Sequence, residues 1–211
     1  MASMNKTIIK LGAVLALFAI VATALVAFTE NTTHDKIKEN ERQALLRAIN
    51  VLIPHNRYDN NILSDTLILP PTDELGTQEK TTVYRARKDG KPVAVVLTSV
   101  APDGYSGSIT MLIGINYNGK LAGVRVINQN ETPGLGDKID DKKSNWVFAF
   151  TGLSLKNPTE DKWKVKKDGG YFDQFTGATI TPRAVVKAVK KTLEYYDKHR
   201  DELFKPMEKQ S

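Results

Sequence analysis

A long apolar segment near the N-terminus is the clearest feature in the pattern of hydrophobic and polar positions. Residues 11–28 contain no charged side chain, and with the two isoleucines before Lys10 they approach the ~20 residues that a helix needs to cross a bilayer. A cleaved signal peptide is the alternative, because Lys6 and Lys10 form a basic flank and Ala22-Thr23-Ala24 has the small-x-small pattern of a cleavage site. The apolar residues continue to Phe28, past that site, which favours a retained transmembrane helix over residues 11–28.

The segment after the apolar run predicts a juxtamembrane helix over residues 29–54. Apolar side chains recur among charged neighbours from residue 35 to residue 53, and Pro54 stops the pattern. The N-terminal tail, residues 1–10, carries two lysines, whereas no basic residue follows the span until Lys36. We therefore expect the tail in the cytoplasm and the rest of the chain on the other side of the membrane.

Alternating apolar residues and turn signals predict an antiparallel sheet in the middle of the chain. Asp89-Gly90 and Asn118-Gly119 are hairpin signals between predicted strands. Hairpins join neighbouring strands, so we expect a meander rather than a parallel sheet. The predicted strands are residues 66–69, 82–87, 93–100, 108–116 and 121–127.

Two helical segments are expected to cover this sheet, one near residues 146–150 and one over residues 182–198. Thr181 and Pro182 match the N-cap and first position of the second helix. Its apolar stripe consists of Val185, Val189, Leu193 and Tyr196. The predicted fold class is therefore α+β, an antiparallel sheet flanked by helices and preceded by a single transmembrane helix. We place this domain at residues 55–200, followed by a charged tail, residues 201–211, that frays.

Composition narrows the chemistry that this chain can perform. The formal net charge is +6, but basic and acidic residues alternate along most of the chain, so a solvated mixed-charge surface is favoured over a nucleic-acid interface. The chain has no cysteine, which excludes disulfides and iron–sulfur clusters ligated by its own thiolates. Its histidines, His34, His55 and His199, lack the spacing of metal ligands. If electrons pass through this protein, an organic cofactor must carry them.

Residues 173–179 form the strongest candidate for a functional site. Thr179 places a hydroxyl on a turn of small residues, two residues before the predicted N-cap Thr181, and the N-terminus of that helix offers N–H groups and partial positive charge to a phosphate. Gly177 and Ala178 leave room for a bulky group to approach the backbone. An ordinary solvent-facing turn is the alternative.

The sequence of this segment closely resembles the flavin-attachment motif Asp-x-x-(Ser/Thr)-Gly-Ala-Thr of covalent FMN-binding proteins in bacterial respiratory complexes. Residues 101–107, 131–138, 166–172 and 180–186 resemble, in the same order, blocks of the G subunit of the Rnf/Rsx ion-translocating electron transport complex. The related C subunit of the sodium-pumping quinone reductase shares the attachment motif and is the nearest alternative. Chain length and the flanking blocks favour Rnf.

The resemblance implies a function as well as a fold. Thr179 would form a phosphoester with FMN, and Asp173, Thr176, Gly177 and Ala178 would be recognised by a separate flavin transferase. The chain would relay electrons on covalent FMN within a coupled ferredoxin and NAD oxidoreductase, with no independent turnover. Its partners would be the other membrane subunits, the transferase and the lipid bilayer, with no nucleic acid. The main domain would lie in the periplasm, anchored in the bacterial inner membrane.

A second candidate site follows the last predicted strand. Its residues are Thr132, Gly134, Leu135 and Gly136, and the two glycines allow a ligand to approach the backbone closely. An ordinary turn is the alternative, and a dinucleotide fingerprint is excluded because its third glycine would fall at Ile139.

Other side chains near the motif have two interpretations each. Lys166 and Lys167 would neutralise a flavin phosphate or form a solvated charge pair. Trp163, Tyr171 and Phe172 would stack on the flavin ring or belong to the core. Gly104-Tyr105-Ser106-Gly107 is one position too short for a nucleophile elbow, which disfavours a hydrolase. An FMN-free extracytoplasmic binding or scaffolding module, with Thr179 unmodified, also stays open.

Overall fold

The computed structural model describes the backbone of residues 2–205 and the side chains of residues 9–30 and 32–205. The chain divides into two compact units, Met1–Leu45 and Leu46–Ser211, and each is described by itself. The side chain of Lys6 and the end of the C-terminal tail, residues 206–211, lie outside the described part.

The first unit belongs to one helix, α1, which spans Ala2–Leu52. The predicted transmembrane and juxtamembrane segments are therefore joined without a break, where the sequence suggested separate elements. Among the described residues, α1 is the single helix long and apolar enough to cross a membrane, and its apolar stretch is not buried against the protein. Large apolar side chains such as Leu15, Phe18 and Leu25 are exposed there, which suits contact with lipid.

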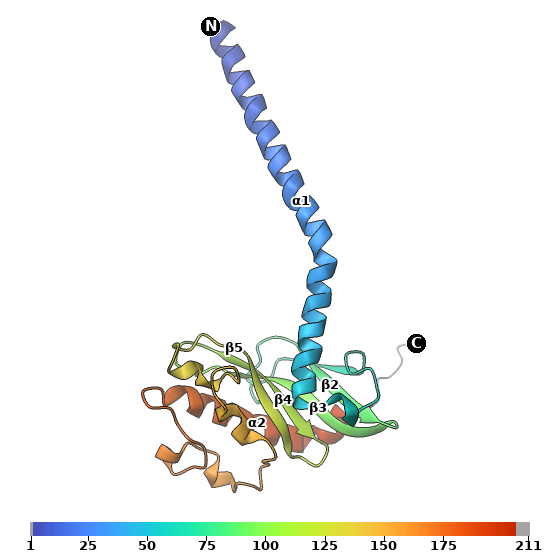
Figure 1. The fold of residues 1–211 in the computed structure, drawn as a ribbon, viewed down its shortest axis with the longest axis vertical. Helices are drawn as coiled ribbons and strands as arrows, with labels where there is room; N and C mark the ends of the chain where they lie inside the picture. The colour runs from blue at the N-terminus through green and yellow to red at the C-terminus, as the bar shows by residue number, and fades with distance from the viewer. Residues whose placement is uncertain (1, 206–211) are drawn as a thin grey trace. The chain divides into compact units, whose positions relative to one another are not determined.

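The second unit is built on a five-stranded antiparallel sheet with strand order β1-β2-β3-β4-β5 (Figure 1). Each strand pairs with the next along the chain, so the predicted meander and the α+β fold class are confirmed. The strands are β1 Thr66–Leu69, β2 Thr81–Lys88, β3 Lys91–Ala101, β4 Ile109–Asn116 and β5 Leu121–Asn128. The end of α1 belongs to this unit, and Leu52 packs where Gly114 and Gly123 pair across β4 and β5.

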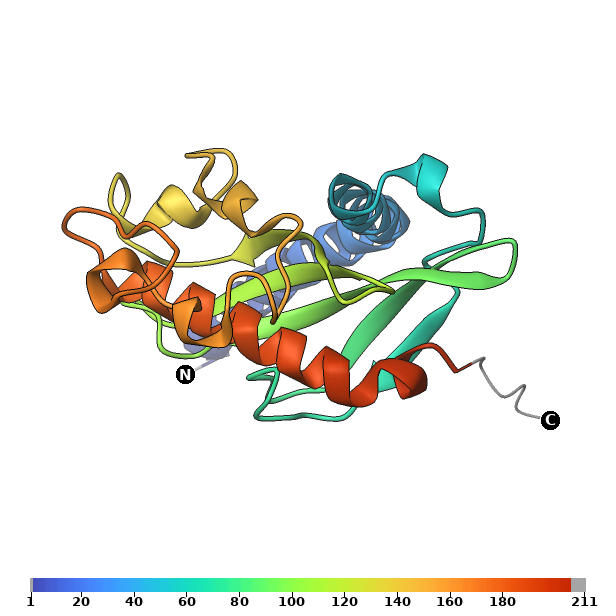
Figure 2. The same ribbon diagram turned by 90° about the horizontal axis from the view of Figure 1, so that it is seen from below.

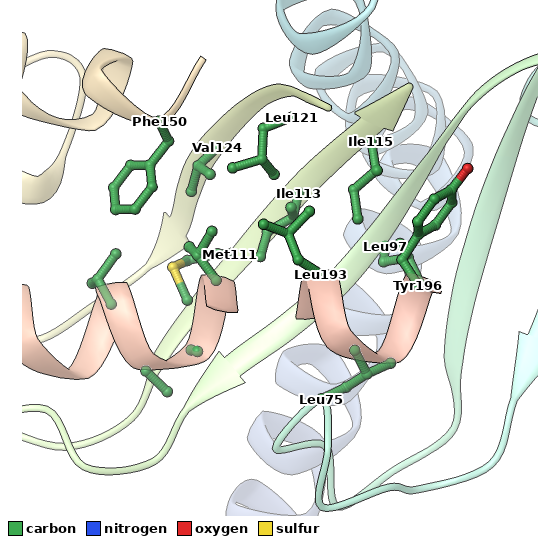
Figure 3. Close-up of a cluster of buried hydrophobic side chains, with 14 of the residues drawn as sticks. Leu75, Leu97, Met111, Ile113, Ile115, Leu121, Val124, Phe150, Leu193 and Tyr196 are labelled. Carbon is green, nitrogen blue, oxygen red and sulfur yellow. The ribbon is translucent and has the colours of Figure 1, made fainter. Parts of the chain in front are cut away.

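A long helix, α2 (Ile180–Leu203), crosses one face of the sheet (Figure 2). The short 3₁₀ helices of this unit are η1 His55–Arg57, η2 Gly136–Ile139, η3 Trp146–Phe150, η4 Glu160–Lys162 and η5 Lys166–Asp168. Figure 3 shows Leu193 and Tyr196 of α2 packed toward Met111, Ile113 and Ile115 of β4. These side chains are nearly or fully buried, as the apolar stripe of α2 predicts.

Both ends of α2 differ from the sequence prediction. The helix begins at Ile180, so Thr181 is its second residue and not its N-cap. Pro182 is tolerated in the third position because the first four N–H groups of a helix have no partner within it. At the other end, α2 continues to Leu203, and both Leu203 and Phe204 are buried, so the tail does not begin at residue 201.

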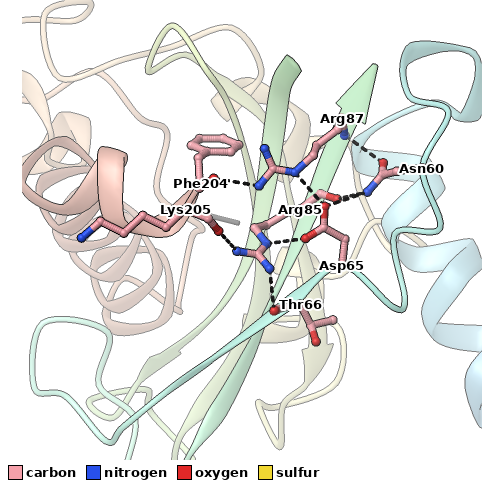
Figure 4. A network of polar contacts seen from close by, with 7 residues as sticks. All are labelled: Asn60, Asp65, Thr66, Arg85, Arg87, Phe204 and Lys205. Carbon is pink, nitrogen blue, oxygen red and sulfur yellow. Dashed lines mark hydrogen bonds and ion pairs between the residues drawn. The ribbon is translucent and has the colours of Figure 1, made fainter. Parts of the chain in front are cut away.

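A polar network holds the C-terminal end of α2 against β2 (Figure 4). The Arg85 side chain is 1% exposed; its Nε lies 2.6 Å from Asp65 Oδ1, and its Nη2 donates to the Thr66 carbonyl at 2.8 Å. Another N–H group of Arg85 donates to the Lys205 carbonyl. Arg87 binds the second oxygen of Asp65 at 2.7 Å and also donates to the carbonyl of the residue before Lys205. One carboxylate therefore balances two arginines that bind the backbone directly after α2.

Candidate functional site

A cleft of about 490 Å³ opens at the N-terminal end of α2. This volume lies within the ~300–1,000 Å³ of typical small-molecule sites. Four separate segments of the chain contribute to its walls, including the turn before α2 and the loop after β5. The lining residues are Tyr105, Glu131, Thr132, Leu135, Gly136, Lys167, Gly177, Ala178, Thr179, Ile180 and Thr181.

Most of the site residues predicted from the sequence meet in this cleft. Its lining includes Gly177, Ala178 and Thr179 of the attachment motif and Thr132, Leu135 and Gly136 of the second candidate site. The two segments are therefore parts of one site, which their separation along the chain did not reveal.

Three predicted residues, Asp173, Thr176 and Gly134, are not among the lining residues. The Asp173 carboxylate is exposed and pairs with Lys166 Nζ at 2.6 Å. Thr176 is exposed, and Gly134 donates its N–H to Asp137 Oδ1 at 2.7 Å. These three positions shape or flank the loops, and their proposed roles in recognition stay predictions.

The attachment motif folds as a tight turn that is anchored from the inside. Ala178 donates its N–H to the Phe175 carbonyl at 3.1 Å, and Gly177 has φ +82°, a conformation that favours glycine. The Phe175 ring is buried 5.3 Å from the Trp146 ring, whose Nε1–H donates to the Asp173 carbonyl at 2.8 Å. The turn is thereby fixed, and its small residues face the cleft.

Thr179 occupies the residue directly before α2 and already has a helical backbone conformation. Within the described part of the chain, its side chain makes no capping hydrogen bond to the helix. The hydroxyl of Thr179 is thus at the cleft and not engaged in holding the helix start. A hydroxyl in this place is available for modification.

Thr181, predicted as the N-cap of the helix, instead forms a buried hydrogen bond with Glu131. It is buried, and its hydroxyl donates to Oε2 of Glu131, a residue 50 positions earlier in the chain. Glu131 is also buried, and its Oε1 accepts a hydrogen bond from the Ser106 N–H at 2.9 Å. The turn at residues 175–178 starts the helix before Thr181, so its hydroxyl has no capping role to fill. Glu131 is the first residue of the block at residues 131–138 that resembles the Rnf subunit, but nothing in the sequence indicated its contacts with Ser106 and Thr181.

Comparison with protein families agrees with this geometry. Residues 104–194 match the model of the FMN-binding domain, and residues 4–52 match the RnfG N-terminal region. The chain is 50% identical over 200 residues to the G subunit of the ion-translocating oxidoreductase complex of Vibrio cholerae serotype O1, an alignment that covers 95% of each protein. It is 48% identical over 201 residues to the protein of the same name from Shewanella baltica, again with 95% of each covered.

The chain belongs to the RnfG family of ion-translocating oxidoreductase complexes. The resemblance to the Rnf complex is confirmed, and the family's FMN-binding region contains every residue that lines the cleft. The family's N-terminal region coincides with most of α1.

One of the two charged side chains that line the cleft, Lys167, suits a phosphate, whereas both oxygens of the other, Glu131, accept hydrogen bonds within the protein. Lys167 is the one basic residue among the lining residues. The short helix that carries it, η5, is fastened to α2 because Asp168 accepts hydrogen bonds from Nε and Nη2 of Arg183, both at 2.6 Å. This guanidinium holds the pKa of the Asp168 carboxyl below its usual value. The backbone N–H of Lys167 also donates to Gln174 at 3.1 Å, which ties η5 to the attachment motif.

The aromatic residues near the motif divide between core and surface. Trp163 and Phe172 are buried, and Phe172 stacks on Phe150 with ring centroids 4.5 Å apart. Of the two interpretations open to them, the core is therefore correct. Tyr171 is exposed, whereas Tyr105, which the sequence had not suggested as a ligand contact, lines the cleft. Within the described residues, no group of three or more potential metal ligands is present.

Proposed function

We propose that this chain is the membrane-anchored component of an ion-translocating oxidoreductase complex that relays electrons on FMN, and that a phosphoester on Thr179 attaches this FMN covalently. The observation that carries the proposal is the placement of an uncommitted threonine hydroxyl on the wall of a cleft of suitable volume. The membership in the RnfG family and the match to the FMN-binding domain support the cofactor.

The residues of the cleft fit a flavin phosphate. A phosphodiester on Thr179 would lie at the start of α2, where backbone N–H groups and the helix dipole favour negative charge. Lys167, on the same cleft, would supply a full positive charge. Tyr105 and Leu135 offer apolar surface for the ring. When bound, FMN supplies the redox chemistry, and the protein contributes position and electrostatics.

The proposal extends to the partners of the chain. A flavin transferase would recognise the exposed motif residues Asp173 and Thr176 together with Gly177 and Ala178. It would transfer FMN from FAD to the Thr179 hydroxyl, so that the pyrophosphate bond of FAD breaks and AMP leaves. Helix α1 would anchor the chain in the inner membrane with the folded unit in the periplasm, beside the other subunits of a ferredoxin and NAD oxidoreductase of the Rnf type. A covalent bond is useful there because a dissociated cofactor would be lost from the periplasm.

The test replaces Thr179 and asks where the flavin resides. Thr179→Val keeps the shape of the side chain and removes its hydroxyl, so we expect no covalent flavin when it is produced with the transferase. Thr179→Ser keeps a hydroxyl and should be flavinylated. Thr110→Val is the matched control, because it removes the hydroxyl of another half-buried threonine that lies outside the cleft and should leave the flavin in place.

Flavin is measured as ultraviolet fluorescence of the protein band after denaturing electrophoresis. A bright Thr179→Val band would move the attachment to another residue and contradict the assignment. A dark wild-type band from a host with a competent transferase would favour the FMN-free scaffolding module instead.

A further inference from the structure

We propose that Glu131 is a positioning residue for flavin attachment. Its carboxylate joins the first turn of α2 to the loop at residues 104–107 through hydrogen bonds from Thr181 and Ser106, and these two bonds, which we call the clasp, fix the cleft around Thr179. This inference rests on the proposed function, since attachment at Thr179 is the step that the clasp would serve. Glu131 itself forms no bond with the flavin in this proposal.

The contacts of Glu131 join segments that are far apart in sequence. Oε1 accepts the N–H of Ser106, 25 positions earlier, and Oε2 accepts the hydroxyl of Thr181, 50 positions later. Glu131 is 4% exposed and Thr181 is fully buried. Loops between secondary-structure elements are otherwise mobile, so two hydrogen bonds to one buried carboxylate, one of them fully buried, restrict the loop and the turn.

The loop at residues 132–136 packs closely against the Glu131 carboxylate. A Cβ atom on Gly136 would lie 2.8 Å from Thr181 Oγ1 and 2.9 Å from Glu131 Oε2. Such distances are shorter than side-chain contacts allow, so only glycine fits between the loop and the clasp. The loop is also closed by hydrogen bonds from the N–H groups of Leu135 and Gly136 to the Thr132 carbonyl, each 3.1 Å long. The absence of a side chain at Gly136 therefore leaves room for the contact between Glu131 and Thr181, and the same residue also lines the cleft.

The position of the clasp explains how it would act on attachment. Thr181 lies two residues after Thr179, in the same turn at the start of α2. When the Thr181 side chain is fixed, this turn is fixed, and the Thr179 hydroxyl has one position relative to the cleft. Loss of the clasp would let the turn and the loop at residues 104–107 move apart, and the hydroxyl would meet an incoming flavin nucleotide in fewer productive encounters.

Three substitutions of Glu131 distinguish the effect of its two hydrogen bonds from the effect of its negative charge. Glu131→Gln keeps the length of the side chain, and its amide would accept from Ser106 and donate to the Thr181 oxygen. Glu131→Asp keeps the charge but is one methylene too short to reach both partners. Glu131→Ala removes both contacts. The clasp therefore predicts rescue by glutamine and not by aspartate.

The experiment uses the full-length apoprotein in detergent with a flavin transferase and FAD, and it follows the rate of covalent flavin incorporation. We expect Glu131→Gln within about threefold of the wild-type rate, and Glu131→Ala and Glu131→Asp slower by about tenfold or more, which corresponds to about 1.4 kcal/mol in activation free energy. Gly136→Ala, which leaves Glu131 in place, should slow incorporation as well.

The control is Asp65→Asn, which disturbs the buried network at the opposite end of α2. It should lower the melting temperature and leave incorporation into the folded protein unchanged. Equal rates in wild type, Glu131→Ala and Glu131→Asp would overturn the proposal, as would a Glu131→Gln rate as low as that of Glu131→Ala.

A second measurement does not depend on the flavin. Amide hydrogen exchange at residues 104–107 and in the first turn of α2 should increase in Glu131→Ala and stay unchanged in Asp65→Asn. If the wild type accepts no flavin, the proposed function fails, while increased exchange in Glu131→Ala would still support the clasp. Unchanged exchange would refute the clasp even if Thr179 carries FMN.

Discussion

The polar network at the C-terminal end of α2 gives a specific prediction about stability, because it contains two guanidinium groups and one carboxylate. Asp65 is the carboxylate that faces both Arg85 and Arg87. Asp65→Ala would leave the guanidinium of Arg85, with 1% of its side chain exposed, without a counter-charge. Removal of one partner from a buried ion pair costs about 3–5 kcal/mol, so we expect a loss in this range.

Arg85→Met should cost less, although it removes the most buried member of the network. Methionine fills a similar volume with apolar atoms, and Asp65 keeps its ion pair with Arg87 at 2.7 Å. The carbonyls of Thr66 and Lys205 would lose a donor. Lys205 is exposed, so water can replace the donor at its carbonyl, and we expect a total cost of about 1–2 kcal/mol.

Urea unfolding followed by tryptophan fluorescence measures both changes. Trp146 and Trp163 lie in the folded unit, and they are the only tryptophans of the chain, so α1 contributes no signal. With a slope of about 2 kcal/mol per molar urea, the midpoint should fall by about 2 M in Asp65→Ala and by less than about 1 M in Arg85→Met. A larger loss in Arg85→Met than in Asp65→Ala would refute the argument from unbalanced charge.

Two further predictions concern pH and topology. Burial raises the pKa of Tyr196, whose hydroxyl donates to the Tyr117 carbonyl at 3.1 Å, whereas an unfolded tyrosine titrates near pH ~10. Its stabilising contribution is therefore complete below pH ~10 and is lost above it, by at most about 1.4 kcal/mol per pH unit, and alkaline unfolding of Tyr196→Phe should show a shallower slope than wild type. Lys156 is exposed, and the natural chain has no cysteine, so Lys156→Cys should react with a membrane-impermeant thiol reagent in intact spheroplasts. Labelling only after lysis would reverse the proposed orientation.

The sheet could be predicted from the sequence because its signals are local. Asp89-Gly90 and Asn118-Gly119 mark hairpins, and the alternation of apolar residues on either side of each turn sets the strands within a few residues. The start of α2 could not be predicted in the same way. Thr181 and Pro182 satisfy the local pattern of a helix start, but the turn at residues 175–178 places the helix two residues earlier.

The candidate site was predictable only in part, and the reason is again the distance along the chain. The attachment motif and the loop at residues 132–136 were recognisable as separate segments. Their meeting in one cleft and the contacts of Glu131 depend on tertiary structure that no local pattern encodes. Likewise, the sequence does not distinguish aromatic residues that contact a ligand from aromatic residues that belong to the core. Only packing assigns Phe172 to the interior and Tyr105 to the cleft.

The two ends of α2 have different roles: the N-terminal end forms part of the cleft, and the C-terminal end is held by the Arg85 network. The helix has 24 residues and is about 36 Å long, so the cleft and the Arg85 network lie far beyond direct contact. Apolar packing along the length of α2 holds it to the sheet regardless of either end. The C-terminal network secures the end of α2, while the polar contacts of Glu131 add to the apolar packing of its N-terminal end. A cleft built in this way can be adjusted for its ligand with little cost to the core, since energetic effects at sites so far apart are nearly additive.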